Sequence, residues 1–224
     1  MNKKVYVFLA DGFEEIEGLT VVDVLRRAGT DTVTVSVTGR KEIEGAHGIR
    51  VLADSLFEGG NFSDAGLLVL PGGMPGTLNL KAHEGLTALL REFDREKKYI
   101  AAICAAPSIL SDLGMLEGKK ACAYPSFEDG LNCAEVVKEP AAVDGHIVTG
   151  RGMGAAIPFA LKLTEILWGK EKADEIAGSI VYRRNREKIL EICGVVCYTV
   201  SMTANIICAI KEEENEFTSR EVRT

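Results

Sequence analysis

The sequence predicts a single α/β domain in which a mainly parallel sheet lies between layers of helices. Three observations lead to this prediction. Short, continuous apolar runs at residues 5–10, 67–70 and 100–103 are typical of parallel strands that are covered on both faces. Stretches with apolar residues at helical spacing follow these runs, and this alternation of strand and helix indicates a parallel sheet. With 224 residues, of which 46% are hydrophobic, the chain is long enough to bury one large core.

The first strand and helix are the clearest unit. Residues 5–10 are apolar throughout, and Ile16, Leu19, Val22 and Leu25 then recur at helical spacing until Gly29 ends the helix. The strict alternation at residues 32–37 predicts a second strand.

The later part of the sequence continues the alternation of strands and helices. A short strand is expected at residues 49–52, and a buried strand at 67–70 precedes a helix marked by Leu86, Leu89, Leu90 and Phe93. Residues 120–123 predict another short strand. Residues 141–149 predict a β-hairpin, because Asp144-Gly145 suits the positive φ angles of a two-residue turn. Residues 150–155 are expected to open a helix whose apolar face consists of Phe159, Leu163, Ile166 and Leu167, and a second helical stretch is expected from Glu171 to Ala177.

Cys104 lies on the turn between the strand at 100–103 and a helix that begins at Pro107. Such a turn holds its central side chain out at the top of a sheet, and the small residues Ala105 and Ala106 leave room for a substrate. The N-terminus of the helix favours a thiolate over a thiol. A lone cysteine is more often a buried core residue, so the function of Cys104 depends on what lies beside it.

Two further strand ends carry unusual residues, and these shift the balance towards a functional cysteine. Glutamates at positions 14, 15 and 17 follow the first strand, and Gly72-Gly73 follow the strand at 67–70. The carboxyl ends of parallel strands meet in one crevice, which brings together an acid, two unobstructed backbone N–H groups and a thiol. These groups suit the addition of a thiolate to a carbonyl and the binding of the resulting oxyanion.

Five motifs, in this order and spacing, resemble the ThiJ/PfpI superfamily, whose fold is similar to the flavodoxin-like fold of the class I glutamine amidotransferases. The motifs are Asp11-Gly-Phe-Glu-Glu-Ile-Glu17, Val22-Asp-Val-Leu-Arg-Arg-Ala-Gly29, Leu70-Pro-Gly-Gly73, Ala101-Ala-Ile-Cys-Ala-Ala-Pro107 and Thr149-Gly-Arg-Gly152. The resemblance is strongest to the branch of the parkinsonism-associated protein deglycase and its bacterial relatives, some of them labelled as thiazole monophosphate biosynthesis proteins.

The resemblance assigns roles to particular residues. It implies that Cys104 is the reactive cysteine and Glu17 the acid beside its sulfur, with the backbone N–H groups of Gly73 and Ala105 as oxyanion donors. It also implies that Gly72, Arg27 and Tyr124 lie around the substrate or support the site, with Arg27 near the site or at a dimer contact. No metal or organic cofactor is implied.

The chain departs from the superfamily's other branches in ways that bear on function. The protease-like branch has a histidine directly after the cysteine, where this chain has Ala105, so peptidase activity is disfavoured. Gly150-Arg-Gly-Met-Gly-Ala155 resembles a dinucleotide fingerprint, but it follows a hairpin late in the chain and not a first βαβ unit.

Composition and the C-terminal segment limit the partners. The net charge of -7 disfavours nucleic acid. Six cysteines without a paired spacing fit a reducing cytoplasm.

The expected domain covers residues 1–184, followed by a C-terminal extension, residues 185–224. Residues 192–210 carry no charge. As a helix, this segment would be about 28 Å long, which is near the minimum for a membrane span. The alternation at 199–206 instead suits a strand, and both alternatives stay open.

The expected function is that of a cysteine-dependent enzyme acting on a small 2-oxoaldehyde such as methylglyoxal, or on its early adducts on proteins, as a glyoxalase or deglycase. This chemistry follows from the resemblance, which also implies a homodimer. The residues themselves support a reactive cysteine beside an acid. The alternative is a redox-sensing or chaperone-like protein of the oxidative stress response, in which Cys104 is oxidised to a stabilised sulfinate.

Overall fold

The computed structural model describes residues 4–183, and the chain divides into two units, residues 1–177 and 178–224. The predicted extension, residues 185–224, and the charge-free segment within it lie outside the described residues. The domain boundary after residue 184 therefore stays a prediction. Within residues 4–183, none of the helices combines the length and the apolar character that crossing a membrane requires.

A seven-stranded sheet forms the centre of the first unit, with the strand order β10-β11-β7-β6-β1-β2-β5. All neighbouring strands are parallel except β10, which pairs antiparallel with β11. The strands are β1 (Lys4–Leu9), β2 (Thr32–Ser36), β5 (Ser55–Leu56), β6 (Ala65–Leu70), β7 (Tyr99–Ile103), β10 (Ala141–Asp144) and β11 (Ile147–Gly150). The predicted mainly parallel sheet and the predicted hairpin are thus confirmed, with Gly145 of the hairpin turn at φ +61°.

Two small sheets lie outside this central sheet. β3 (Glu42–Glu44) and β4 (Arg50–Leu52) form an antiparallel pair, and β8 (Lys120–Ala121) and β9 (Glu135–Val136) form a parallel pair. The short strands predicted at 49–52 and 120–123 therefore exist, but neither joins the central sheet. Leu52 is 75% exposed, and a central strand needs both faces covered.

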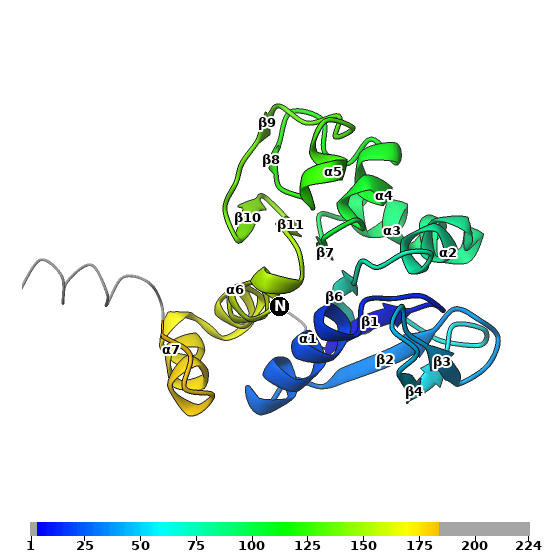
Figure 1. The fold of residues 1–224 in the computed structure, drawn as a ribbon, viewed down its shortest axis with the longest axis horizontal. Helices are drawn as coiled ribbons and strands as arrows, with labels where there is room; N and C mark the ends of the chain where they lie inside the picture. The colour runs from blue at the N-terminus through cyan, green and yellow to red at the C-terminus, as the bar shows by residue number, and fades with distance from the viewer. Residues whose placement is uncertain (1–3, 184–224) are drawn as a thin grey trace, which may run out of the picture. The chain divides into compact units, whose positions relative to one another are not determined.

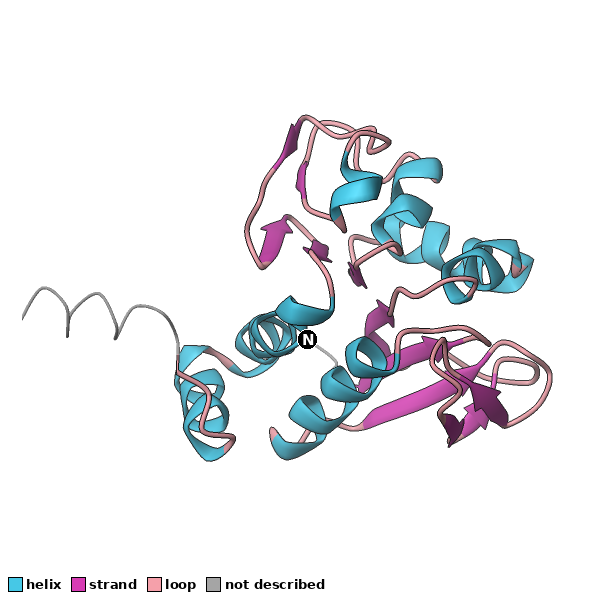
Figure 2. Cartoon of the chain, viewed as in Figure 1, coloured by secondary structure: helices cyan, strands magenta, loops and turns pink. Residues whose placement is uncertain are grey.

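Helices cover both faces of the sheet (Figures 1 and 2). They are α1 (Glu15–Arg27), α2 (Gly76–Ala82), α3 (Glu84–Arg95), α4 (Pro107–Asp112), α5 (Pro125–Glu128), α6 (Ala156–Trp168) and α7 (Lys170–Ser179), with a 3₁₀ turn at Met153–Ala155. α1 packs against α6. On the opposite face, buried residues of α2, α3 and α4 share one core cluster with alternate residues of β1, β6 and β7. The apolar runs of these strands are continuous because each face meets a helix layer.

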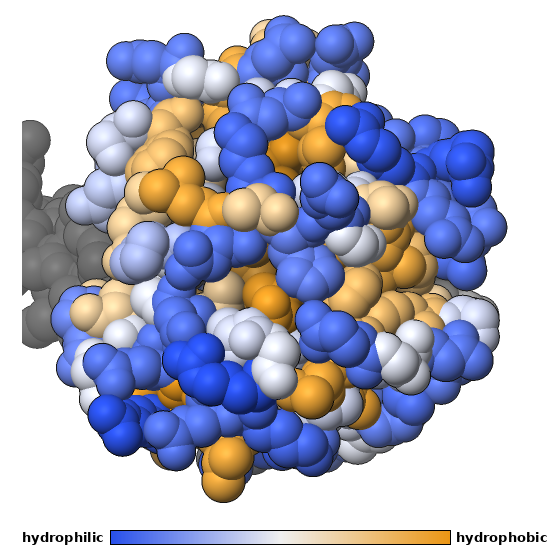
Figure 3. Space-filling view, turned by 90° about the vertical axis from the view of Figure 1, so that its right-hand side faces the viewer, coloured by the Kyte–Doolittle hydropathy of each residue, from blue (hydrophilic) through white to orange (hydrophobic). Residues whose placement is uncertain are grey.

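The connection between β1 and α1 shows how the sequence sets a boundary that matters for the site. α1 begins at Glu15, directly after the turn that closes β1, and Gly29 at φ +82° follows its last turn, as predicted. This places the acidic first turn of α1 at the carboxyl edge of the sheet. On the side of the molecule that includes α2 and the β3–β4 hairpin, polar residues surround several separate apolar patches (Figure 3).

Candidate active site

Cys104 occupies a strained turn between β7 and α4. Its φ of +66° is in the left-handed region, which residues other than glycine rarely adopt. Two backbone hydrogen bonds hold the turn in place: Cys104 N donates to Gly150 O at 2.9 Å, and Tyr124 N donates to Cys104 O at 2.8 Å. The strand, the strained turn and the following helix match the nucleophile elbow that the sequence predicts.

Glu17 reaches the cysteine from the first turn of α1. Its side chain is fully buried, and its Oε2 accepts a hydrogen bond of 2.9 Å from Gly72 N. Gly72 lies beside both groups and leaves room for them to meet, because a Cβ at this position would lie 2.6 Å from Cys104 Cβ and 2.8 Å from Glu17 Oε2. A side chain at position 72 would therefore push the acid and the thiol apart, which explains the glycine.

The backbone N–H groups of Gly73 and Ala105 face the sulfur of Cys104. Both form hydrogen bonds that lower the pKa of the thiol, although burial, the largest influence, raises it. Gly73 has φ +90°, and a side chain there would collide with the backbone of Glu14. The structure thus brings together four of the predicted site groups: the thiol of Cys104, the carboxyl of Glu17 and these two backbone donors.

The acid and the thiol influence each other's protonation. Burial raises the pKa of Glu17 to about 7. Burial, and after it the negative charge of Glu17, raises the pKa of Cys104 to about 12. Burial is the largest cause of both shifts, because it disfavours the charged form of each group, and at Cys104 the charge of Glu17 adds to it. Over the range between these values, the two groups together carry one proton and one negative charge.

The other two glutamates after β1 do not point at the cysteine in the same way. Glu15 is buried, and its Oε1 accepts a hydrogen bond of 2.8 Å from His47 N, while its Oε2 lies 2.9 Å from His47 Nδ1. Glu15 therefore anchors the turn between β3 and β4. Burial acts to raise the pKa of Glu15, but hydrogen bonds from His47 lower it overall, and Glu15 in turn raises the pKa of His47.

Among the described residues, Glu14, Glu15 and His47 are the group whose ligand atoms lie close enough together to hold a metal ion.

Two further predicted residues differ in where they lie. Tyr124 is beside Cys104 through the backbone hydrogen bond described above, and its side chain is half-exposed. Arg27 is at the far end of α1, ten residues or about 15 Å from Glu17 along the helix axis. Its guanidinium binds Asp23 at 2.6 Å. Within one chain Arg27 is therefore not brought to the thiol, and its role at a dimer contact stays a prediction.

Gly150 is a site residue whose role sequence reasoning missed. Its carbonyl accepts the hydrogen bond from Cys104 N, and a Cβ here would lie 2.7 Å from the Phe159 side chain and 2.8 Å from that of Ile103. The glycine was visible in the motif at 149–152, but only the fold shows that it supports the elbow. Gly150, the last residue of β11, thus has a packing role beside Cys104, which accounts for the first glycine of the apparent dinucleotide fingerprint.

These features define a flavodoxin-like α/β protein in which Cys104 lies on a strand-to-helix elbow beside a buried carboxyl. The chain belongs to the DJ-1/PfpI family, whose sequence model matches residues 3–166.

Comparisons with known proteins agree on this family. Protein DJ-1 homolog A of Arabidopsis thaliana is 38% identical over 220 residues, which cover 96% of this chain and 56% of that protein. Protein dj-1beta of Drosophila melanogaster is 35% identical over 187 residues, covering 83% of this chain and all of that protein. The solved structure of oxidised Toxoplasma gondii DJ-1 has a TM-score of 0.78 and 39% identity, covering 81% of this chain and 99% of that one. The chain thus spans about half the length of the Arabidopsis homologues and nearly the whole of the others.

Proposed function

We propose that this chain is a cofactor-independent enzyme in which Cys104 attacks the aldehyde carbon of a small 2-oxoaldehyde, or the same carbon in its early adducts on protein amines and thiols, from which the amine or thiol leaves. The observation that carries the proposal is the contact of three kinds of group around Gly72: a thiol on a strained elbow, a fully buried carboxyl and two backbone N–H donors. An acid with a pKa of about 7 can both accept and donate a proton near neutral pH.

The reaction uses these groups in order. The sulfur of Cys104 adds to the aldehyde carbon and forms a hemithioacetal, while the charge passes from sulfur to the neighbouring oxygen. The N–H groups of Gly73 and Ala105, which face the sulfur before the addition, are placed to follow this charge. Protonated Glu17 first gives its proton to the negatively charged oxygen. Its carboxylate then takes the proton from the former aldehyde carbon, which gives an enediolate, and returns it to the adjacent carbon. The hydroxyl proton passes from the first oxygen to the second, and a thioester of the 2-hydroxy acid is left. Water cleaves the thioester, releases a 2-hydroxy acid and restores the thiol, so that no external oxidant or reductant is needed.

The arrangement of donors also bears on where the single proton of the Cys104–Glu17 pair lies. The charge of an ionised Glu17 alone would keep the proton on sulfur and raise the pKa of the thiol. Against this, two N–H groups face the sulfur, whereas the carboxyl accepts one N–H bond and its Oε1 has no hydrogen-bond partner among the described residues. We infer that the proton lies mainly on Glu17, whose protonated carboxyl then donates to a thiolate.

The decisive experiment measures lactate produced from methylglyoxal by the purified chain. We expect saturable production that is lost in Cys104→Ala and strongly reduced in Glu17→Gln, which keeps the size of the side chain but cannot shuttle a proton. Cys133→Ala is the control, because Cys133 is partly exposed and lies outside the site. Production that survives Cys104→Ala would refute the proposal.

A second candidate is a redox sensor in which peroxide oxidises Cys104 to a sulfinate. One specific observation favours it: a solved relative with 39% identity, Toxoplasma gondii DJ-1, is described as oxidised. The same N–H groups that face the sulfur could bind a sulfinate oxygen. Peroxide-dependent formation of a stable sulfinate in a chain without lactate production would favour this candidate over the first.

We also propose a homodimer that includes α1. Ile16 and Leu19 are 51% and 38% exposed, and together with Asp23 and Arg27 they follow one another at helical spacing along a single face of α1. Sedimentation tests this: the wild-type chain should be a dimer and Leu19→Lys a monomer, and a wild-type monomer would refute the proposal.

Cytoplasmic location and the absence of nucleic acid as a partner stay predictions from composition.

A further inference from the structure

A cavity of about 380 Å³ lies at the carboxyl edge of the sheet, between the ends of β1 and β2 and the helix pair α2 and α3. Small-molecule sites range from roughly 300 to 1,000 Å³, so this volume suits a small ligand. Cys104, Glu17 and Gly73 do not line it. The cavity is thus separate from the candidate active site, although both open at the same edge of the sheet.

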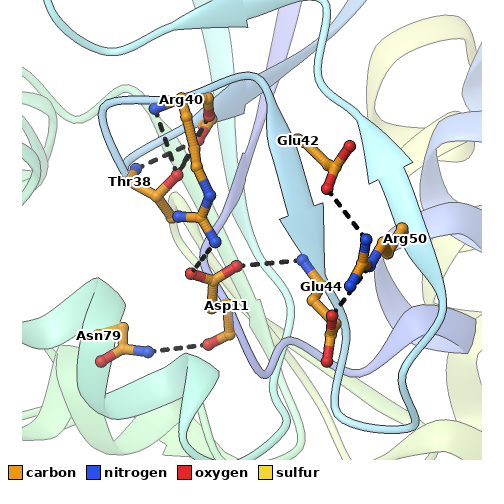
Figure 4. A network of polar contacts seen from close by, with 8 residues as sticks. Asp11, Thr38, Arg40, Glu42, Glu44, Arg50 and Asn79 are labelled. Atoms are coloured by element: carbon orange, nitrogen blue, oxygen red, sulfur yellow. Dashed lines mark hydrogen bonds and ion pairs between the residues drawn. The ribbon is translucent and has the colours of Figure 1, made fainter.

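Two charged residues of the cavity wall neutralise each other. Arg40, in the loop after β2, donates through Nη2 to Asp11 Oδ2 at 2.7 Å, and Asp11 Oδ1 accepts a bond of 3.0 Å from Glu44 N (Figure 4). The other guanidinium N–H groups of Arg40 bind no acceptor among the described residues. The pair therefore offers hydrogen-bond donors and a carboxylate acceptor without a net positive charge, which does not suit a phosphate or another strong anion.

His83 adds a donor with a fixed orientation. Its Nδ1 accepts a hydrogen bond of 3.0 Å from Leu86 N at the start of α3, so in the neutral ring the proton is on Nε2. Glu58 Oε1 is 3.7 Å from Nε2, which is too far for a hydrogen bond. The ring also packs against the edge of Phe57, with 4.5 Å between the centroids. His83 is therefore held by the cap and by Phe57, and no hydrogen bond among the described residues uses its Nε2–H.

The rest of the cavity wall contains both polar and apolar groups. Asn79 donates through Nδ2 to Asp11 O at 2.8 Å, which orients its amide at the cavity, and Thr38 contributes a hydroxyl. Ala10, Val37 and Ala82 contribute apolar surface.

We propose that this cavity binds a small, uncharged, polyhydroxylated ligand of the size of a monosaccharide or a sugar alcohol. Adjacent hydroxyl groups both donate and accept hydrogen bonds, as the mixed wall of Arg40, Asp11 and His83 requires. The C–H faces of such a ligand pack on Ala82 and Val37. The wall contains no cysteine or other nucleophile that the structure activates, so the function is binding and not turnover. This site is independent of the reaction proposed for Cys104.

The test is calorimetric titration of the full chain with methyl α-D-glucopyranoside and with D-sorbitol. Neither probe has a free aldehyde, so neither reacts with Cys104. We expect saturable binding that is the same in Cys104→Ala, and this separates the outcome from that of the enzymatic proposal. Ala82→Leu, at a helical and exposed position, fills the cavity and should abolish binding.

Two further variants remove single donors. Arg40→Ala and His83→Asn should each weaken binding by about tenfold, as expected for the loss of a hydrogen bond in a ligand site. Asparagine can still cap α3, so His83→Asn withdraws the Nε2 donor and keeps the fold. Arg50→Ala is the matched control, because Arg50 pairs with Glu42 and Glu44 in the neighbouring hairpin and does not line the cavity (Figure 4). No saturable binding of either probe, binding unaffected by Ala82→Leu, or binding of inorganic phosphate in their place would each overturn the proposal.

Discussion

Two cysteines near the carboxyl edge of the sheet have opposite surroundings. Cys104 is partly exposed on a strained elbow, and backbone N–H groups point at its sulfur. Cys122 is fully buried, and its Sγ is 3.2 Å from the carbonyl oxygen of Thr149, to which the thiol donates. Burial raises the pKa of both thiols. Backbone N–H groups lower the pKa of both thiols, two of them at Cys104 and that of Ala142 at Cys122, but the Cys122 thiol also donates its proton to the Thr149 carbonyl, which favours the protonated form.

The comparison shows that the backbone, more than the residue type, decides which cysteine is reactive. The donors at Cys104 come from the turn itself and from the glycine pair after β6, while Cys122 meets a carbonyl of β11. The protonated carboxyl that we infer for Glu17 donates a hydrogen bond to the first cysteine, whereas Thr149 holds the second, with Cys122 N donating to its Oγ1 at 2.9 Å.

The largest expected effect is in the rate of alkylation. Iodoacetamide should modify Cys104 at least about a hundredfold faster than Cys122, because Cys122 reacts only after a local opening that costs a few kcal/mol. Cys133 should also react more slowly than Cys104, since burial raises the pKa of both thiols and one backbone N–H, that of Glu135, opposes this at Cys133, whereas Cys104 has two such donors and a carboxyl that we infer to hold the shared proton. Peptide mass spectrometry of briefly treated, folded protein measures the order. Earlier modification of Cys122 or Cys133 would contradict the site assignment.

Much of this site could be predicted from the sequence, because it depends on local patterns. The apolar run before Cys104 and the proline at the start of α4 placed the cysteine on a turn, and the motifs around Glu17 and Gly73 identified its neighbours. Each of these signals is confined to a few consecutive residues and does not depend on which strands pair.

The remainder depends on contacts between distant segments. Glu15 and Glu17 are two positions apart, yet one anchors the β3–β4 hairpin and the other contacts Cys104, because only the packed structure shows what each side of the helix meets. Likewise, the strands at 49–52 and 120–123 could be predicted, but their exclusion from the central sheet could not. The cavity beside Arg40 and His83 joins residues more than 70 positions apart along the chain.

The second prediction concerns stability and pH. The Cys104–Glu17 pair loses its first proton near pH 7 in the folded chain, whereas Glu17 in the unfolded chain loses its proton near 4.5, so between these values the folded chain holds one proton more. Stability from this group is therefore complete below pH 4.5 and falls as the pH rises towards 7. Glu17→Gln removes the titration and should stabilise the chain at pH 8 by up to about 3 kcal/mol, with no such gain at pH 4. Urea unfolding at the two pH values measures the difference, and an equal effect at both would contradict the buried, titrating carboxyl.

The third prediction concerns the proton shared by Glu17 and Cys104. If it lies mainly on Glu17, then Glu17→Ala removes the donor to the thiolate and should raise the apparent pKa of the thiol by about one unit. Glu17→Gln keeps a donor and should raise it less. The pH dependence of thiolate absorbance measures both variants. A lower pKa in Glu17→Ala would show that the wild-type carboxyl is ionised beside a protonated thiol, with Glu17 acting as a base on Cys104.

The smallest expected effect is that of Cys122→Ala, which provides the control for the whole comparison. The substitution removes one sulfur from a fully buried position and one hydrogen bond to Thr149, so it should cost about 1 kcal/mol of unfolding free energy. The carbonyl of Thr149 lies in β11, one residue before the Gly150 carbonyl that holds Cys104 N. If Cys122 has only a structural role, Cys122→Ala lowers the denaturant midpoint and leaves both the alkylation rate of Cys104 and lactate production unchanged. If Cys122→Ala slowed either reaction at Cys104 tenfold or more, the two cysteines would be coupled through β11, and the separation of a reactive from a structural thiol would be wrong.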